Sequence, residues 1–241
     1  MRLSSARSDT AVTPESFSIL YRDADILVAV KRAGVPSQPD KTGADDFLSQ
    51  ITRDLLASGY PPERPPFLVG RLDRPVGGIL LVGLSNRSAK VLTCGYMRDN
   101  AEKGYTAVVS GVPDPENGRL TDYLVRNGSL NYSRPVPEGQ IGAKFSELSY
   151  RTVRTVTLAA TKETVSVLLV RLVTGRHHQI RVQLANAGIP IRGDTKYNPA
   201  CRGRTGGGKT ALFASDLTIR HPATGKMLTF HADPPFLADL V

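Results

Sequence analysis

The chain has 241 residues, 40% of them hydrophobic, which suits one large domain or two subdomains that share a core. Lysine and arginine number 31 against 22 aspartate and glutamate residues, and this charge of +9 favours a polyanionic partner, although basic proteins without one exist. With two cysteines, Cys94 and Cys201, and no apolar run near ~20 residues, the sequence argues against a disulfide framework, a zinc cluster and a membrane span, and it favours the reducing cytoplasm.

The first third of the chain predicts a leader, a hairpin and a helix. Residues 1–16 lack an apolar core and predict a short disordered leader rather than a secretory signal; part of an organelle-targeting segment is the alternative. Short β-rich runs at 17–21 and 26–30, separated by the polar residues 22–25, predict a hairpin. A helix is expected over 44–58, because its apolar residues recur on one face. These residues are Phe47, Leu48, Ile51, Leu55 and Leu56.

The stretch from 67 to 82 holds the most distinctive charge pattern. Asp73 lies between Arg71 and Arg74, and an apolar run flanks the three residues on either side. The apolar runs predict buried strands, and residues 75–78 predict a turn between them. A carboxylate and two guanidinium groups would then be displayed at a strand end. The alternative is an ordinary surface salt bridge of Asp73 with Arg71 or Arg74.

The rest of the chain predicts mostly hairpins, and so an α+β fold with a largely antiparallel sheet flanked by helices. A region rich in Gly, Pro and Asn is expected to be the least ordered part, with a turn at Asn127-Gly128. The poorly ordered region is 112–142. Two helices are predicted: one is capped by Ser85 or Asn86 and runs to about Arg98 through Ala89, Leu92 and Tyr96, and the other is opened by Thr174-Gly175 and stopped by Gly188 and Pro190. The predicted strands are 103–109 and two hairpins, 147–160 with 165–173 and 211–219 with 227–232.

One segment matches a nucleotide-binding motif without its structural context. Residues 203–210 fit the G-x-x-x-x-G-K-T phosphate loop, but the preceding residues indicate a turn and the following ones a strand, so a nucleotide triphosphatase is disfavoured.

A pair of histidines could suggest a metal site or a general base. His177 and His178 are adjacent, point about 100° apart on a helix and cannot chelate one ion together. They are better explained as histidines that pack or form hydrogen bonds where a helix begins.

Arginines gather around the helix that follows residue 175. They form either a solvated basic face or a groove that grips phosphates, with one arginine turned inward to a carboxylate. The four residues are Arg171, Arg176, Arg181 and Arg192.

Taken together, three segments resemble the RluA-type pseudouridine synthases. Gly70-Arg71-Leu72-Asp73-Arg74 is similar to the family's acid motif, residues 103–107 to its Lys-x-Tyr strand, and residues 174–184 to its Thr-Gly-Arg-x-His-Gln-Ile-Arg segment. The likeness spans about residues 17–236 in the family's order. It implies the pseudouridine synthase fold with a central RNA-binding cleft, a catalytic domain at 17–241 and no S4 domain.

The departures from the family pattern leave the acid, the tyrosine and the arginine in place. Gly70 stands where the family usually has histidine, His177 where it has threonine, and Phe213-Ala214 where a Leu-His pair is frequent. Val76-Gly77 replaces the usual Thr-Ser.

The resemblance also implies roles for individual residues. Asp73 would be the catalytic carboxylate, Arg181 would pair with it, Arg71 would fill the space of a flipped base, and Tyr105 would stack on the target uracil and is a candidate for removing its C5 proton. Arg176 is expected to contact RNA. No metal and no organic cofactor are needed, because the reaction involves neither a redox step nor net hydrolysis.

The expected function is therefore isomerisation of specific uridines in ribosomal or transfer RNA by a monomer that has no membrane partner. The alternative is an RNA-binding or ribosome-assembly protein that keeps the fold and has little activity.

Overall fold

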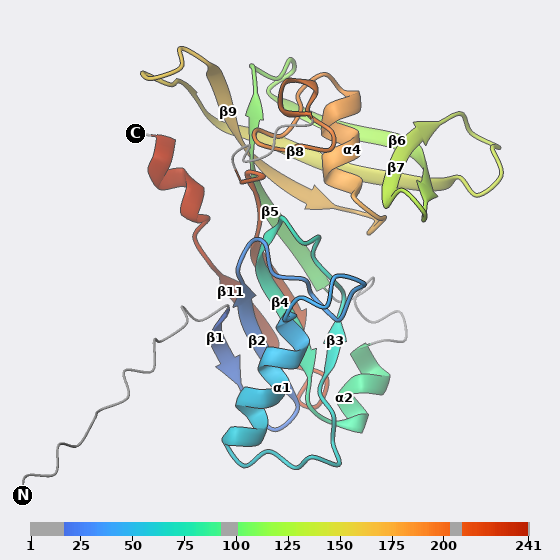
Figure 1. Cartoon of the computed structure of the whole chain (residues 1–241), viewed down its shortest axis with the longest axis vertical. Helices are drawn as coiled ribbons and strands as arrows, with labels where there is room; N and C mark the ends of the chain where they lie inside the picture. The colour runs from blue at the N-terminus through green and yellow to red at the C-terminus, as the bar shows by residue number, and fades with distance from the viewer. Residues whose placement is uncertain (1–16, 93–100, 203–208, 241) are drawn as a thin grey trace, which may run out of the picture.

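A computed structural model of the chain describes residues 17–92, 101–202 and 209–240, so the predicted leader at 1–16 lies outside the described residues. The described strands form one eleven-stranded sheet, and the main path through it is β1-β2-β4-β10-β5-β9-β8-β6-β7. Neighbouring strands are antiparallel except where β10 runs parallel to β4. The predicted α+β fold with a largely antiparallel sheet is confirmed (Figure 1).

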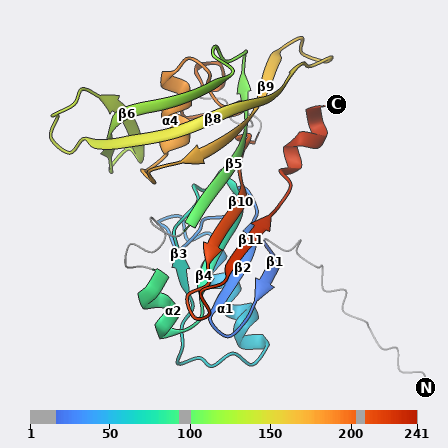
Figure 2. The same cartoon turned by 180° about the vertical axis from the view of Figure 1, so that it is seen from behind.

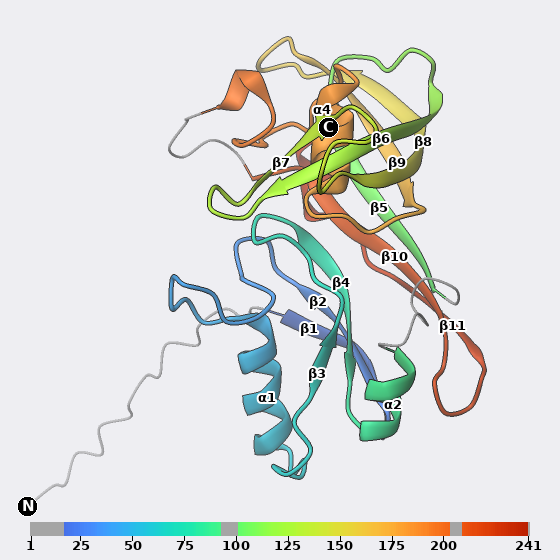
Figure 3. The ribbon, with the colours of Figure 1, turned by 90° about the vertical axis from the view of Figure 1, so that its right-hand side faces the viewer.

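The first half of the molecule is built mainly from the N-terminal segments. It contains β1 (Phe17–Arg22), β2 (Ile26–Lys31), α1 (Phe47–Ala57), β3 (Phe67–Val69), β4 (Gly77–Gly83), α2 (Asn86–Val91) and β11 (Met227–His231). Two long strands, β5 (Ala101–Ser110) and β10 (Leu212–Arg220), connect this half to the second, as Figures 2 and 3 show. The predicted hairpins at both ends of this half are confirmed by the pairing of β1 with β2 and of β10 with β11.

The second half packs one helix against a four-stranded part of the sheet. It contains β6 (Asn117–Asn127), β7 (Tyr132–Val136), β8 (Lys144–Thr157), β9 (Thr164–Leu172), α4 (Gln179–Asn186) and the short helix η2 (Pro199–Cys201). A last short helix, η3 (Pro235–Leu240), ends the described chain (Figure 1). None of the helices among the described residues is long and apolar enough to cross a membrane.

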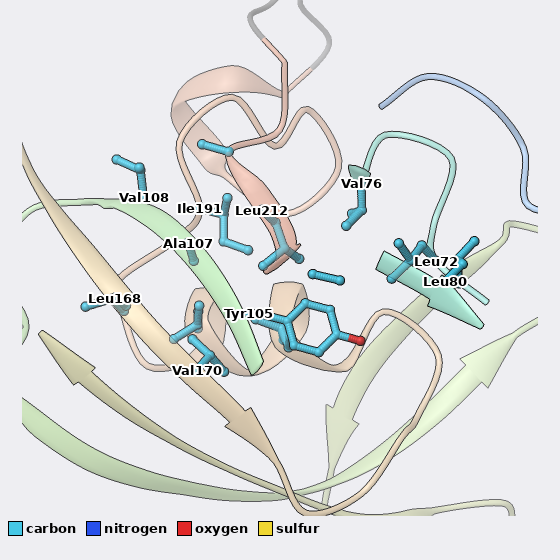
Figure 4. Close-up of a cluster of buried hydrophobic side chains, with 14 of the residues drawn as sticks. Leu72, Val76, Leu80, Tyr105, Ala107, Val108, Leu168, Val170, Ile191 and Leu212 are labelled. Carbon is cyan, nitrogen blue, oxygen red and sulfur yellow. The ribbon is translucent and has the colours of Figure 1, made fainter. Parts of the chain in front are cut away.

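A buried apolar cluster joins the two halves. It includes Leu80 of β4, Val108 of β5, Leu168 of β9 and Leu212 of β10, all nearly inaccessible to solvent (Figure 4). Removing this much apolar surface from water is the main stabilising contribution in any such domain. Since the cluster is continuous, the strands on either side of the β10–β5 pair are held in a fixed relation.

The helix predicted over 44–58 is confirmed, with a narrower apolar face than expected. It begins at Phe47, after Asp46 caps its N-terminus by accepting a hydrogen bond from the backbone N–H of Ser49. Ile51 and Leu55 are buried with Phe47, whereas Leu56 is 44% exposed, so its predicted place on the buried face is wrong.

Residues 112–142 are much better ordered than the composition suggests. They contain β6 and β7, which pair over five positions from Tyr123↔Val136 to Asn127↔Tyr132. The glycine and proline content misled the prediction, because Gly118 lies directly under the Tyr150 ring, where any Cβ would clash. The turn predicted at Asn127-Gly128 is confirmed, and the Asn127 side chain accepts a hydrogen bond from the backbone N–H of Leu130.

The turn beside Asp73 lies two residues earlier than predicted. A hydrogen bond from the backbone N–H of Val76 to the carbonyl of Asp73 closes it, and Gly77 and Gly78 already belong to β4. These glycines are needed in the strand because β10 approaches β4 closely. A Cβ on Gly78 would lie 2.4 Å from the backbone nitrogen of Ala214.

Two helix boundaries also differ from expectation. The helix predicted to open at Thr174-Gly175 begins at Gln179, because residues 174–178 form a loop that ends in a left-handed residue at His178. In α2, Ser85 rather than Asn86 is the cap, since its hydroxyl accepts a hydrogen bond from the N–H of Ser88. The predicted continuation of α2 through Tyr96 to Arg98 lies outside the described residues.

Candidate active site

Asp73 lies in the loop between β3 and β4, and a neighbouring loop holds the backbone on both sides of it. The Ser37 hydroxyl donates a hydrogen bond to the carbonyl of Leu72 and accepts one from its N–H, at 2.7 and 3.1 Å. On the other side, the N–H of Gly34 donates to the carbonyl of Arg74 at 2.7 Å. Since residues 72 and 74 are both held, the backbone position of Asp73 between them is fixed as well.

Arg181 of α4 reaches this carboxylate from the other half of the molecule. Its Nη1 atom donates to Asp73 Oδ2 at 2.9 Å, and the arginine side chain is only 5% exposed. Among the described residues, no ion pair joins Asp73 to Arg71 or Arg74. The surface salt bridge that the sequence left as an alternative is therefore wrong.

A second carboxylate, which the sequence analysis missed, occupies the rest of the Arg181 guanidinium. Asp194 accepts from Nε at 2.7 Å through Oδ2 and from Nη2 at 2.9 Å through Oδ1. It also accepts backbone N–H groups from Lys196 and Tyr197. Burial alone would raise the pKa of Asp194, but Arg181 and these N–H groups lower it overall. No local spacing pairs residue 194 with residue 181, so the sequence carries no signal for this contact.

His178 and Tyr197 close the site behind Asp73. His178 Nε2 lies 3.7 Å from Asp73 Oδ2, and its Nδ1 lies 2.7 Å from the Tyr197 hydroxyl, which also accepts the backbone N–H of Ser133. Burial lowers the pKa of His178 to about 3, so the imidazole is neutral. The neighbouring His177 stacks on His178 and bonds to Ser133 Oγ. Both histidines pack and form hydrogen bonds at the helix start, as expected.

Tyr105 lines a small pocket in front of the carboxylate. The pocket has a volume of about 70 Å³, and Asp73, Arg71, Arg176 and Ile180 also line it. The tyrosine ring rises from β5 within the apolar cluster that joins the two halves (Figure 4). Burial, and secondly the charge of Asp73, raise the pKa of the Tyr105 phenol, which is therefore protonated at neutral pH.

Lys31 was not singled out from the sequence, yet it is fully buried beneath the loop that holds Asp73. Its Nζ donates to the carbonyl groups of Arg32 and Val35, at 3.0 and 2.7 Å. Burial lowers the pKa of Lys31 to about 7, while the charge of Asp73 acts in the opposite direction. The lysine thus organises the loop that contacts residues 72 and 74.

The other arginines of the predicted cluster are dispersed. Arg176 is exposed beside the pocket, and its Nε donates to the carbonyl of Phe145 at 3.0 Å. Arg171 pairs with Glu102 at 3.7 Å and Arg192 with Glu163 at 3.2 Å, and neither arginine lines the pocket of Asp73. Arg71 lines this pocket, is exposed, and has no ion pair or side-chain hydrogen bond within the part of the chain that the structure describes.

Neither a metal cluster nor a phosphate loop is found among the described residues. They contain no group of three or more His, Cys, Asp and Glu side chains that could hold a metal ion. Most of the phosphate-loop match, residues 203–208, lies outside them. The first element after the match is strand β10, which begins at Leu212, and a phosphate loop needs a helix there.

Known RNA pseudouridine synthases are similar to this chain over most of its length. Residues 25–186 match the family model described as RNA pseudouridylate synthase. The dual-specificity RNA pseudouridine synthase RluA of Escherichia coli K12 is 32% identical over 221 residues, which cover 90% of this chain and 93% of that protein. The tRNA pseudouridine synthase C of Pasteurella multocida is 30% identical, with 90% and 91% covered. The solved structure of human RNA pseudouridylate synthase domain containing 1 superimposes with a TM-score of 0.75 at 24% identity, covering 95% of this chain and 89% of the human one.

Proposed function

This chain belongs to the RluA family of RNA pseudouridine synthases, and on that premise we propose that Asp73 is its catalytic carboxylate. The enzyme is an isomerase: the N1–C1′ bond of a uridine breaks, the base turns, and a C5–C1′ bond forms while the C5 proton leaves and N1 gains a proton. One observation carries the proposal. Arg181 Nη1 holds Asp73 at 2.9 Å at the wall of a pocket that Tyr105 also lines.

Asp73 would act at the ribose of the target nucleotide. A carboxylate can stabilise the positive charge that develops at C1′, or form a transient covalent bond there or at C6 of the base. Its contact with Arg181 supports this role, because a charge-assisted hydrogen bond from the guanidinium orients the carboxylate. The clamp formed by Ser37 and Gly34 limits the movement of the loop, as a reacting group requires.

Tyr105 would stack on the target uracil inside the pocket. Aromatic stacking on an extruded base is worth about 1–3 kcal/mol. Since the phenol is protonated at neutral pH, it could take the C5 proton only while it gives up its own. The proposal for Tyr105 therefore rests more on stacking than on proton transfer.

Arg71 and Arg176 would contact the RNA around the pocket. Arg71 is exposed at the pocket and has no competing partner among the described residues, so it is available to fill the space that a flipped base leaves. Arg176 is the second exposed cation at the same rim. With the net charge of +9 providing general affinity, the target would be a uridine in a loop of ribosomal or transfer RNA, where unstacking is least costly.

We further propose that residues 17–241 form the catalytic domain and that the protein acts as a monomer in the cytoplasm, without a metal or an organic cofactor.

Release of tritium from RNA labelled at uridine C5 tests the role of Asp73. We expect release by the unmodified protein and a loss on the order of 10⁴-fold or more for Asp73→Asn, the size seen when an essential reacting group is replaced. Equal release by both proteins would refute the assignment of Asp73. Silence of both, with RNA binding retained, would favour an RNA-binding or ribosome-assembly protein.

A comparison of folded with unfolded RNA tests the role of Arg71. We expect Arg71→Ala to reduce tritium release from a folded RNA by about 10- to 100-fold, because base extrusion costs a few kcal/mol there. The loss should be much smaller on a short single strand. Arg87→Ala, an exposed arginine on α2, is the matched control and should change neither rate. A loss of equal size on both substrates would contradict the flipping role.

A further inference from the structure

The two oxygens of the Asp73 carboxylate have different surroundings. Oδ2 accepts the hydrogen bond from Arg181 and is the oxygen that faces His178. Oδ1 has no hydrogen bond within the described residues, and the Asp73 side chain is 25% exposed, toward the pocket. Resting on the proposed catalytic role of Asp73, we propose that Oδ1 is the reacting oxygen and that His178 is a positioning residue whose Nε2–H donates to Oδ2.

The hydrogen bonds around Tyr197 settle which nitrogen of His178 carries the proton. The Tyr197 oxygen accepts a backbone N–H from Ser133 at 2.9 Å, and a backbone N–H can only donate. The Tyr197 O–H needs an acceptor of its own, and within the described residues the one in reach is His178 Nδ1, 2.7 Å away in a buried setting. Nδ1 is then an acceptor, so the proton of the neutral ring is on Nε2, the atom nearest to Asp73.

Burial is the main reason that the pKa of His178 is lowered and the ring is neutral. Beyond burial, the cations Arg181 and Lys196, together with His177, oppose its protonation, and only Asp73 favours it. Burial lowers the pKa of His177 as well. A neutral donor beside a carboxylate can stabilise its charge without transferring a proton to it. With its pKa lowered to about 3, the imidazole keeps the same hydrogen-bonding pattern at neutral pH.

The backbone conformation of His178 is strained. The residue has φ of 55°, in the left-handed region, which is uncommon for any residue other than glycine, and its side chain forms no cap with the helix that follows. The conformation directs the ring between Tyr197 and Asp73 rather than toward the N–H groups of α4. Strain of this kind persists where the surrounding structure imposes it and is concentrated at functional sites.

The separation of 3.7 Å between His178 Nε2 and Asp73 Oδ2 is longer than a hydrogen bond. Contacts of this kind often tighten only when substrate is bound. When the C1′ of the nucleotide enters the pocket beside Oδ1, a small turn of the carboxylate brings Oδ2 within reach of Nε2–H. Arg181 and His178 would then hold one oxygen, and the other would remain free for the ribose.

Two substitutions of His178 each remove one of its two proposed hydrogen bonds and keep the other. His178→Asn keeps an acceptor near the position of Nδ1 for Tyr197, tolerates the left-handed backbone, and lacks the donor to Asp73. His178→Gln places an N–H near the position of Nε2 and gives up the contact with Tyr197. Each variant would be checked for thermal unfolding and RNA binding before its rate is measured. The asparagine variant therefore tests the donor, and the glutamine variant tests its rescue.

Single-turnover tritium release from C5-labelled RNA would be measured for both variants at saturating RNA, with Asp73→Asn beside them. Without the donor, Oδ2 is held by Arg181 alone, so we expect the rate of His178→Asn to fall by about 10-fold, with little change in RNA affinity. His178→Gln should recover most of that rate. A rate of His178→Asn equal to that of the unsubstituted protein, or an equal loss in both variants, would overturn the proposal.

Nitrogen NMR of the unsubstituted protein tests the tautomer without reference to activity. With ¹⁵N-labelled histidine, we expect His178 to show the neutral Nε2–H tautomer, unchanged down to about pH 4, because its pKa is lowered to about 3. A proton on Nδ1, or titration between pH 5 and pH 7, would overturn the inference even if the enzyme is active. Absence of tritium release, with the Nε2–H tautomer observed, would instead count against the proposed role of Asp73.

Discussion

Two carboxylates share the guanidinium of Arg181, and their surroundings differ sharply. The Asp194 side chain is fully buried and receives four hydrogen bonds, two from Arg181 at 2.7 and 2.9 Å and two from backbone N–H groups at 3.0 and 3.2 Å. The Asp73 side chain is 25% exposed and receives one, at 2.9 Å. Both oxygens of Asp194 thus accept hydrogen bonds, whereas Oδ1 of Asp73 accepts none from the residues that the structure describes.

This difference separates a structural acid from the acid proposed to be catalytic. A buried charge is tolerated when charge partners and hydrogen bonds satisfy it, and Asp194 meets that condition fully. Asp194 binds Nε and Nη2 of Arg181, and the guanidinium presents Nη1 to Asp73. The Asp194 contact therefore fixes the direction from which Asp73 is held.

Replacement of Asp194 should give the largest change in stability. Asp194→Asn leaves a buried guanidinium without its main partner and places an amide N–H against other donors. We expect the free energy of unfolding to fall by about 3–5 kcal/mol, measured by urea titration. Asp216→Asn is the matched control, because this aspartate is 45% exposed and pairs with His231 at the surface, and it should cost less than about 1 kcal/mol. Similar costs for the two substitutions would remove the distinction.

Arg181→Lys should give the next largest effect. A single ammonium group cannot satisfy both carboxylates in the geometry of the guanidinium. We expect a loss of about 2 kcal/mol in the free energy of unfolding, since one hydrogen-bonded pair remains, together with slower tritium release. Arg192→Lys, whose side chain is 37% exposed and pairs with Glu163, should change stability by less than about 1 kcal/mol. An Arg181→Lys protein with unaltered stability and rate would show that the shared guanidinium is dispensable.

Acid should reduce the difference in stability between the unsubstituted protein and Asp194→Asn. The pKa of Asp194 is lowered in the folded state, so its contribution is fully present above its unfolded value, near 3.8, and is lost as the pH falls through the lower folded value. We expect the difference in unfolding free energy to shrink below about pH 4, by at most about 1.4 kcal/mol per pH unit. A difference that is the same at pH 7 and pH 2.5 would contradict this assignment.

Local sequence patterns predicted most of the elements in this molecule but not how they come together. The spacing of Phe47, Ile51 and Leu55 predicts a helix, and alternating runs predict the hairpins, because both signals depend on residues a few positions apart. The parallel contact of β10 with β4 joins Phe213 to Gly77, and no periodicity encodes such a pairing. Strands β6 and β7 were missed because glycine and proline can also serve close packing and strand edges.

The candidate site was predictable only in part for the same reason. Asp73 and Arg181 are 108 positions apart, and their pairing was expected from a family resemblance rather than from spacing. Asp194 and Tyr197 complete the site through contacts that form only when the loop after α4 folds back onto the helix. Lys31 escaped notice because a lone lysine at the end of a strand usually lies at the surface, whereas here it is fully buried.

The smallest effect on stability should come from Asp73 itself. Asp73→Asn keeps an oxygen that can accept from Arg181 Nη1, and the side chain is partly exposed, so we expect a change within about 1 kcal/mol in the free energy of unfolding. The substitution that removes the activity would then leave the fold nearly as stable as before, whereas Asp194→Asn weakens it severely. Urea titration of the two variants side by side measures this contrast. A large loss of stability in Asp73→Asn would mean that both acids are structural, because a reactive carboxylate with a free oxygen contributes little to the fold.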